Sequence, residues 1–159
     1  VIAQKIGARN PEEMFVAGLL HDLGKVMMPL AAPEVPELVE ARVRQGDVLW
    51  VEAEAEILGL THSIVADWLA EKWNLPVTIR EPLAYHHQPA RARHAIKHTA
   101  AVHVANSLVR AAGFGNPGDD LVPPIERAAW DALGLAEGDL DEIVDEASGI
   151  LAAEGSLVL

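Results

Sequence analysis

Residues 10–25 read NPEEMFVAGLLHDLGK, an apolar stretch with acidic residues near its start and an adjacent histidine and aspartate near its end. It opens with a strong helix-start signal. Asn10 is a preferred N-cap, Pro11 suits the first helical position, and Glu13 can close a capping box. The apolar run that follows, residues 14–23, predicts a largely buried helix.

A histidine and an aspartate, His21 and Asp22, stand near the carboxyl end of this predicted helix, which Gly24 and Pro29 are expected to end. Burying both side chains without partners is costly, and an imidazole together with a carboxylate can bind a divalent metal ion. A structural alternative stays open, in which the pair is hydrogen-bonded and fixes a helix end. Lys25 lies four residues after His21 on the same helical face, where it could contact a phosphate.

The rest of the chain is divided by helix caps, prolines and glycines, and it has no hairpin signal. The segment 51–57 is ambiguous, because apolar residues alternate with glutamates as in a half-buried strand. Alanine and glutamate favour helices, so we expect a helix there. The expected class is all-α, with about seven helices and no sheet. The predicted helices after the first are 33–45, 51–57, 62–73, 77–87, 94–112, 123–133 and 139–154.

The positions of large apolar side chains predict which faces of these helices are packed. Thr61 is a good N-cap for the helix 62–73, and the apolar residues of that helix share one face: Ile64, Val65, Trp68 and Leu69. The tryptophans are expected to be packing anchors rather than groups that stack on a ligand: Trp50, Trp68, Trp73 and Trp130.

The composition suits a single folded domain over residues 1–159, with 50% hydrophobic residues. The chain has no cysteine, which excludes disulfides, thiolate metal sites and thiol nucleophiles. No apolar run reaches about 18 residues, and the amino terminus lacks the pattern of a signal peptide. We therefore expect a cytoplasmic protein without a membrane span. The opening residues, Val1 to Ile6, have a helical composition, and the first helix is expected to be truncated at its start.

The formal net charge is −12, so nucleic acid and anionic lipid are not expected partners. The charge is unevenly distributed. From Pro82 to Gly118 there is no acidic residue, and this stretch holds five of the seven histidines. Two interpretations remain open: a coincidence of helix faces, or a positive wall beside an anion or metal site.

Three more histidines lie near expected helix ends. His62 directly follows the N-cap Thr61, and His86 and His87 close the predicted helix 77–87. Adjacent side chains on a helix point about 100° apart, so both histidines can reach one metal ion only near a helix end. Their position meets that condition.

The predicted helix 94–112 carries two further pairs. His103 and Asn106 are three residues apart and share one face. His94 and His98 are also neighbours on the helix, and we assign them to its solvated basic face.

Several of these motifs together resemble a known family. Residues 17–25, AGLLHDLGK, resemble the HD superfamily of metal-dependent phosphohydrolases. Residues 54–62 (EAEILGLTH), 73–76 (WNLP) and 85–89 (YHHQP) resemble the HDOD domain, the HD-related output domain of bacterial signalling proteins. The resemblance covers residue 1 to about residue 150, and it implies an all-α fold that corresponds to the carboxyl-terminal, HD-type half of that domain.

The resemblance also implies a set of metal ligands. Asn106 occupies the degenerate position of the last ligand, where HD enzymes have an aspartate. A divalent ion, Zn, Fe, Mn or Mg, is the candidate cofactor, and the alternative is that the retained histidines bind no metal and only fix helix ends. The implied ligands are His21, Asp22, His62, His86 and His87.

Three departures from the enzymes stand out. No histidine is found among the 20 residues before His21, whereas HD enzymes have a ligand histidine upstream of the pair. Asn106 is a poorer ligand than aspartate. Residues 88–91, QPAR, stand where related cyclic-dinucleotide phosphodiesterases carry a Gly-Tyr-Pro motif.

Two functions remain. The favoured one is a non-catalytic signalling module that acts through a protein partner, an adjoining signalling domain or a second copy of itself. The alternative is a metal-dependent phosphohydrolase or phosphodiesterase, in which Lys25 and the basic stretch stabilise phosphate oxygens. No catalytic residue is assigned.

Overall fold

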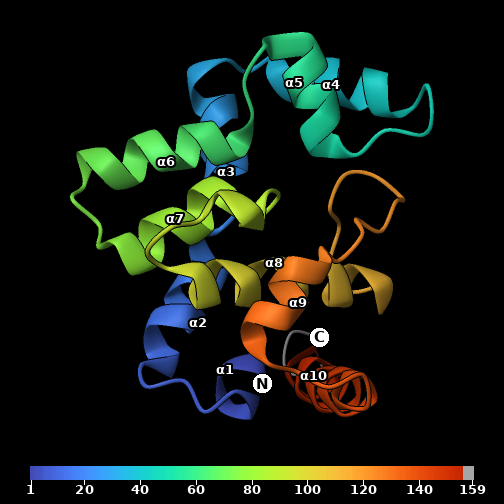
Figure 1. Ribbon diagram of the computed structural model, residues 1–159. Helices are drawn as coiled ribbons and strands as arrows, with labels where there is room; N and C mark the ends of the chain where they lie inside the picture. The colour runs from blue at the N-terminus through green and yellow to red at the C-terminus, as the bar shows by residue number, and fades with distance from the viewer. Residues whose placement is uncertain (156–159) are drawn as a thin grey trace.

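The computed structural model describes residues 1–155, and these form helices and connecting loops without a strand. The predicted all-α class is confirmed. Figure 1 shows α6, α7 and α8 one above another, with α4 and α5 at one end and α1 and α10 at the other. The helices are α1 (Ile2–Lys5), α2 (Pro11–Leu20), α3 (Leu23–Ala31), α4 (Val35–Val43), α5 (Trp50–Leu58), α6 (His62–Lys72), α7 (Val77–Tyr85), the short 3-10 helix η1 (Pro89–Arg91), α8 (Ile96–Ala111), α9 (Arg127–Leu133) and α10 (Asp139–Gly155).

The chain turns at His21 and Asp22, where the sequence predicts a continuous helix. A second helix, α3, begins at Leu23 and contains both residues that were expected to end the first one, Gly24 and Pro29. Gly24 has a packing role instead, because an added Cβ there would lie 1.9 Å from the carbonyl oxygen of His62. The glycine thus lets α3 lie directly against the start of α6.

The prediction that residues 14–23 form a largely buried helix is wrong. Met14 and Ala17 are buried, but Phe15 and Leu19 are 70% and 71% exposed. The N-cap prediction also fails in part, since Asn10 makes no side-chain capping hydrogen bond.

The stretch Pro11–Ala31 is long and apolar enough to cross a membrane by length and composition, in contrast to the sequence expectation. In this fold the polar turn at His21 and Asp22 interrupts it. Its two helices pack against α6, α7 and α8. The stretch Pro11–Ala31 is therefore two packed helices of the helical domain in this structure.

The helix α6 confirms its predicted cap and corrects its predicted face. The backbone N–H of Ile64 donates to Thr61 Oγ1 at 3.4 Å. The buried side of the helix carries small residues, Ala66 and Ala70, whereas Trp68 is 55% exposed. Small side chains let α6 lie close to its neighbours, and the cluster at this contact consists of Ala17, Ala66, Ala70, Ile79, Leu83 and Val102.

The tryptophans divide into two groups, so their predicted role as anchors holds only in part. Trp68 and Trp73 are exposed, while Trp50 and Trp130 are half-buried and pack against core clusters. The ambiguous segment 51–57 is helical, as predicted, within α5.

A buried glutamate joins α7 to the start of α8. The carboxylate of Glu81 accepts backbone N–H groups from Arg93, His94 and Ala95, at distances from 2.6 to 3.2 Å. Burial raises the pKa of Glu81, but these hydrogen bonds lower it more, so that the pKa lies below its ordinary value of 4.5. The ionised form is therefore the one that stabilises the fold.

We expect Glu81→Gln to lower the free energy of unfolding by about 1.5–3 kcal/mol at pH 7, because hydrogen bonds to a charged group are lost. The folded pKa lies below the unfolded one, so this contribution is complete above pH 4.5 and is lost as the pH falls through the folded pKa. Urea unfolding of both proteins between pH 7 and pH 3 measures it. The control is the same substitution, Glu34→Gln, at an exposed residue whose side chain makes no capping hydrogen bond. A pH-independent difference between wild type and Glu81→Gln would contradict the assignment.

Candidate metal centre

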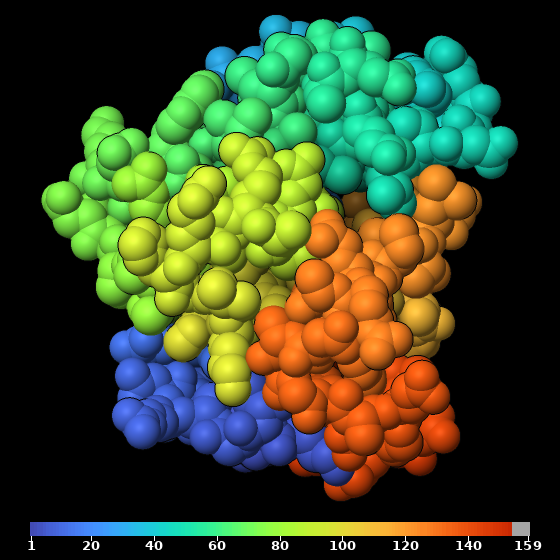
Figure 2. All heavy atoms as spheres, viewed as in Figure 1, coloured from blue at the N-terminus to red at the C-terminus, as the bar shows by residue number. Residues whose placement is uncertain are grey.

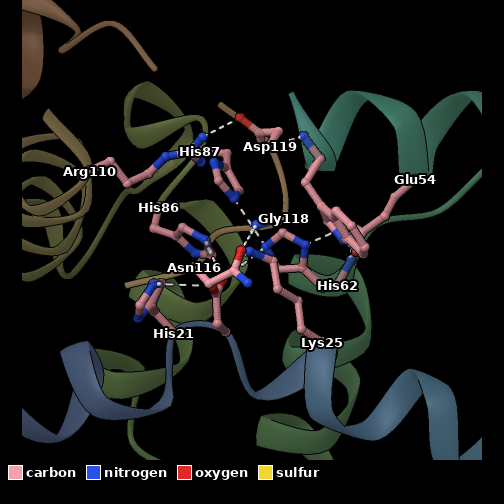
Figure 3. Close-up of polar contacts among 12 residues, drawn as sticks. His21, Lys25, Glu54, His62, His86, His87, Arg110, Asn116, Gly118 and Asp119 are labelled. Carbon is pink, nitrogen blue, oxygen red and sulfur yellow. Dashed lines mark hydrogen bonds and ion pairs between the residues drawn. The ribbon is translucent and has the colours of Figure 1, made fainter. Parts of the chain in front are cut away.

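Three elements place polar side chains at one point in the helical domain. The turn between α2 and α3 carries Asp22. The first residue of α6 is His62, and the chain leaving α7 carries His86 and His87; Figure 3 shows these three rings together. Each of these four side chains offers one ligand atom, and the four atoms lie within 4.8 Å of one another. Segments far apart in the sequence thus form one polar cluster.

Distances within the cluster are short. Asp22 Oδ1 lies 3.2 Å from His62 Nε2 and 3.6 Å from His86 Nε2. His62 Nε2 lies 3.1 Å from His87 Nε2. The end of α7 explains how adjacent histidines both reach this point: His86 is the C-cap, so His87 has already left the helix.

The far sides of two of the three rings are each held by an acceptor. His62 Nδ1 lies 2.6 Å from Glu54 Oε2, and His86 Nδ1 lies 3.2 Å from the carbonyl oxygens of Pro82 and Leu83. A carboxylate or carbonyl cannot donate, so each Nδ1 carries a hydrogen, and in its neutral form each of these two rings has its lone pair on Nε2. Both lone pairs face the cluster, which is the arrangement of metal-binding histidines with outer carboxylate or carbonyl partners.

Burial and neighbouring charges shift the pKa values in the cluster. Burial raises the pKa of Asp22, but imidazoles at His62 and His86 lower it more, and the carboxyl stays ionised. Burial lowers the pKa of His62, yet Asp22 and Glu54 raise it above its ordinary value. Burial dominates for His86, whose pKa falls to about 4, and for His87, whose pKa is also lowered. His86 and His87 are therefore neutral at physiological pH, the form that binds metal.

Two buried atoms in the cluster lack a hydrogen-bond partner: Asp22 Oδ1 and His86 Nε2. Leaving such atoms unpaired is costly, and a cation between them would satisfy both. Three imidazole nitrogens and one carboxylate oxygen suit Zn²⁺ or iron. The residues present therefore fit the metal ion that the sequence predicts.

The fifth predicted ligand, His21, lies beside the cluster. Its Nε2 is 3.6 Å from Asp22 Oδ2, and its ring packs edge-on against His86 with centroids 5.0 Å apart. Its Nδ1 lies 2.6 Å from the carbonyl oxygen of Gly18. His21 is not one of the four converging ligands, and its role as a ligand stays a prediction.

Lys25 and Asn106 also lie at the edges of the site. Lys25 Nζ donates to Asp22 Oδ2 at 2.9 Å, so its charge already has a partner. Asn106 is half-buried and, with His21, lines a largely apolar cavity of about 680 Å³. A phosphate contact for Lys25 and a ligand role for Asn106 both stay predictions.

The basic stretch does not act as a uniform wall of free charge. The Arg110 side chain is 8% exposed and paired with Asp119, and Arg91 lies over the ring of Tyr85 with its guanidinium carbon 4.9 Å from the centroid. His98 is half-buried near Glu13, which corrects its assignment to the solvated face.

Sequence reasoning missed the role of Glu54. This residue is 1% exposed, and besides the His62 ring it accepts the backbone N–H of His62 at 2.8 Å and Trp50 Nε1 at 2.9 Å. Its membership of the EAEILGLTH motif was the available signal. The alternation of glutamates in 51–57 concealed it, because nothing in that pattern shows which glutamate faces inward.

Comparisons with known proteins agree with this picture. A family model, the HDOD domain, matches residues 1–89. A crystal structure of an HDOD domain protein of unknown function from Geobacter sulfurreducens superposes with a TM-score of 0.79 and 26% sequence identity, over 96% of this chain and 54% of the other. This chain thus spans about half the length of that protein. No curated protein matches it. Because the family model covers more than half of its residues, the chain belongs to the HDOD domain family.

Proposed function

We propose that this chain is a non-catalytic regulatory module of a bacterial signalling protein, built around one structurally bound divalent metal ion. The observation that supports the metal site is the convergence of Asp22, His62, His86 and His87, with two buried atoms unpaired. Membership of the HDOD family supports a signalling or HD-related role.

The number of ligands favours a structural over a catalytic ion. Structural zinc sites use four protein ligands, whereas catalytic sites keep one position open for water or substrate. Four converging ligands, two of them fully buried histidines, would complete the four-ligand set of a structural site. The replacement of the last enzyme ligand by Asn106 points the same way.

A bound ion would join the α2–α3 turn, α6 and the end of α7. Ligation of this kind contributes directly to folding stability, since the unfolded chain has no preformed site. Zn²⁺ or iron suits the imidazole-rich set better than Mg²⁺, which prefers oxygen ligands.

The output of the module would come from its helix surfaces. We propose that these contact a protein partner, an adjoining signalling domain or a second copy of the chain, in the cytoplasm. In this proposal residues 1–159 act as one unit.

A phosphohydrolase is the second candidate. One observation favours it: His21 lies beside the cluster and lines the cavity that reaches Asn106. If His21 entered the ligand set, or if one of the four ligands were free, a position for water would open. Lys25 would then lie beside the bound substrate.

We expect protein expressed with Zn²⁺ to contain about one ion per chain by elemental analysis. Removing the ion is expected to lower the melting temperature by roughly 5–10 °C, because a ligand at 100 times its Kd contributes about 2.7 kcal/mol. Asp22→Asn and His87→Ala should remove the ion, whereas exposed His94→Ala should not. Less than about 0.1 ion per chain in the wild type would contradict the metal centre.

Turnover separates the two candidates. We expect no hydrolysis of bis(p-nitrophenyl) phosphate by the metal-loaded protein. If the wild type hydrolysed this substrate and Asp22→Ala did not, the proposal of a non-catalytic module would be wrong and the phosphohydrolase would be supported.

A further inference from the structure

The loop after α8 is tied to the helix that carries Glu54. The Asp119 side chain is 1% exposed; its Oδ2 accepts the backbone N–H of Trp50 at 2.8 Å and its Oδ1 accepts that of Leu121 at 3.0 Å. Arg110 donates to the same carboxylate and to the carbonyl of Leu121. Asp119 is thus a buried anchor between the loop and the first residue of α5.

From this anchor a hydrogen-bonded path leads to the metal centre. The Trp50 indole donates to Glu54 Oε1, and Glu54 Oε2 accepts from the His62 ring (Figure 3). Gly118 packs against the indole, where an added Cβ would be 2.3 Å from the ring, so the ring has no room to move toward this side. The position of Asp119 therefore fixes Trp50, which fixes Glu54, which orients His62.

The loop that begins near Asp119 ends at Glu126, and this end is joined through His103 to the backbone of His86. His103 on α8 is 5% exposed, and its Nδ1 lies 2.7 Å from the carbonyl oxygen of His86. Its Nε2 accepts the backbone N–H of Glu126 at 2.9 Å. Both contacts require a neutral ring with the hydrogen on Nδ1. His103 thus joins the end of the loop to the backbone that carries His86 and His87.

We propose that the segment 119–126, which supplies none of the four converging ligands, positions the metal centre from behind. Its positioning residues are Asp119 at one end and, at the other end, His103 of α8, which accepts the backbone N–H of Glu126. This inference rests on the proposed metal site. Figure 2 shows this part of the chain, in orange, on the visible face between the α4–α5 end and α9. Outer partners of metal ligands typically contribute about 10–100-fold to metal affinity.

The test is a Co²⁺ titration of the full chain, monitored by visible absorption. The growth of the absorption bands reports the affinity, and their positions and intensities report the coordination geometry. We expect Asp119→Asn and His103→Gln to weaken Co²⁺ binding by up to about tenfold, the lower end of the effect of a direct outer partner, and to change the spectrum. His103→Asn should recover most of the affinity, because its amide N–H lies near the position of Nδ1 and can still donate to the His86 carbonyl. Gln places its amide near Nε2 and cannot.

Asp67→Asn is the matched control. It breaks a half-buried ion pair with Arg80, at 2.6 Å, that also joins two helices of the site, α6 and α7, without contacting a ligand. We expect its Co²⁺ affinity and spectrum to equal those of the wild type, although its stability falls. If lower folding stability alone weakened Co²⁺ binding, Asp67→Asn would lose affinity as well.

The outcomes separate the two proposals. If the wild type binds Co²⁺ and the Asp119 and His103 variants bind it equally well with the same spectrum, the positioning role is wrong and the metal centre stands. If the wild type binds no Co²⁺, both proposals fail. Should Asp119→Asn not fold, the contrast between His103→Gln and His103→Asn decides.

Discussion

Replacing Gly24 with alanine is expected to lower the free energy of unfolding by about 3 kcal/mol or more, the upper range for overpacking. The added Cβ would lie 1.9 Å from the carbonyl oxygen of His62 and 2.6 Å from its carbonyl carbon. These are backbone atoms at the start of α6, so no side-chain rotation can relieve the overlap. Relief requires α3 and α6 to separate, which would also move Asp22 away from His62.

Gly18→Ala is the control for this change. Gly18 lies in α2, on the other side of the turn, and an added Cβ there would have no atom within 4 Å. Alanine is the better helix former by about 1 kcal/mol, so this variant should be equal to the wild type or more stable. Urea unfolding of both variants in EDTA gives the comparison. Equal stabilities for Gly24→Ala and Gly18→Ala would mean that α3 and α6 are not in close contact.

Replacing Glu54 with alanine is the second change with a large expected effect. It removes the acceptor of three donors: the His62 ring, the His62 backbone N–H and the Trp50 indole. Breaking a buried charged network by removing one partner costs about 3–5 kcal/mol. We expect a loss of that size in urea unfolding in EDTA, together with weaker metal binding because His62 loses its orientation.

Glu56→Ala provides the comparison on the same helix. Glu56 lies two residues along α5, its side chain is 50% exposed, and it pairs with Arg42 at 2.6 Å. Exposed ion pairs contribute about 0–1 kcal/mol, so this variant should remain close to the wild type. If the two substitutions had the same effect, the buried network around Glu54 could not be as described.

Most of the helical segments follow from local sequence. Thr61 begins α6, the Ala and Glu content of 51–57 makes α5 a helix, and Gly134 ends α9 with a positive φ of 69°. These features act over a few residues, so a single stretch of sequence contains them. The motifs around His21, His62 and His86 likewise predict the family.

The buried faces of the helices do not follow in the same way. The sequence predicts Ile64 and Trp68 on the packed side of α6, whereas small residues such as Ala66 occupy it. Large apolar side chains dominate any hydrophobicity pattern. Close packing of helices around a polar centre instead favours small ones, because they let the backbones approach.

The amino-acid sequence by itself determined the all-α class, most of the helical segments and the candidate ligands, because caps, breakers and motifs are local. Only the tertiary structure decided that Asp22, His62, His86 and His87 converge while His21 stays beside them. It also revealed Glu54 and His103 behind the ligands. The physical reason is that such contacts join residues distant along the chain, and the packing of α3, α6, α7 and α8 sets their distances.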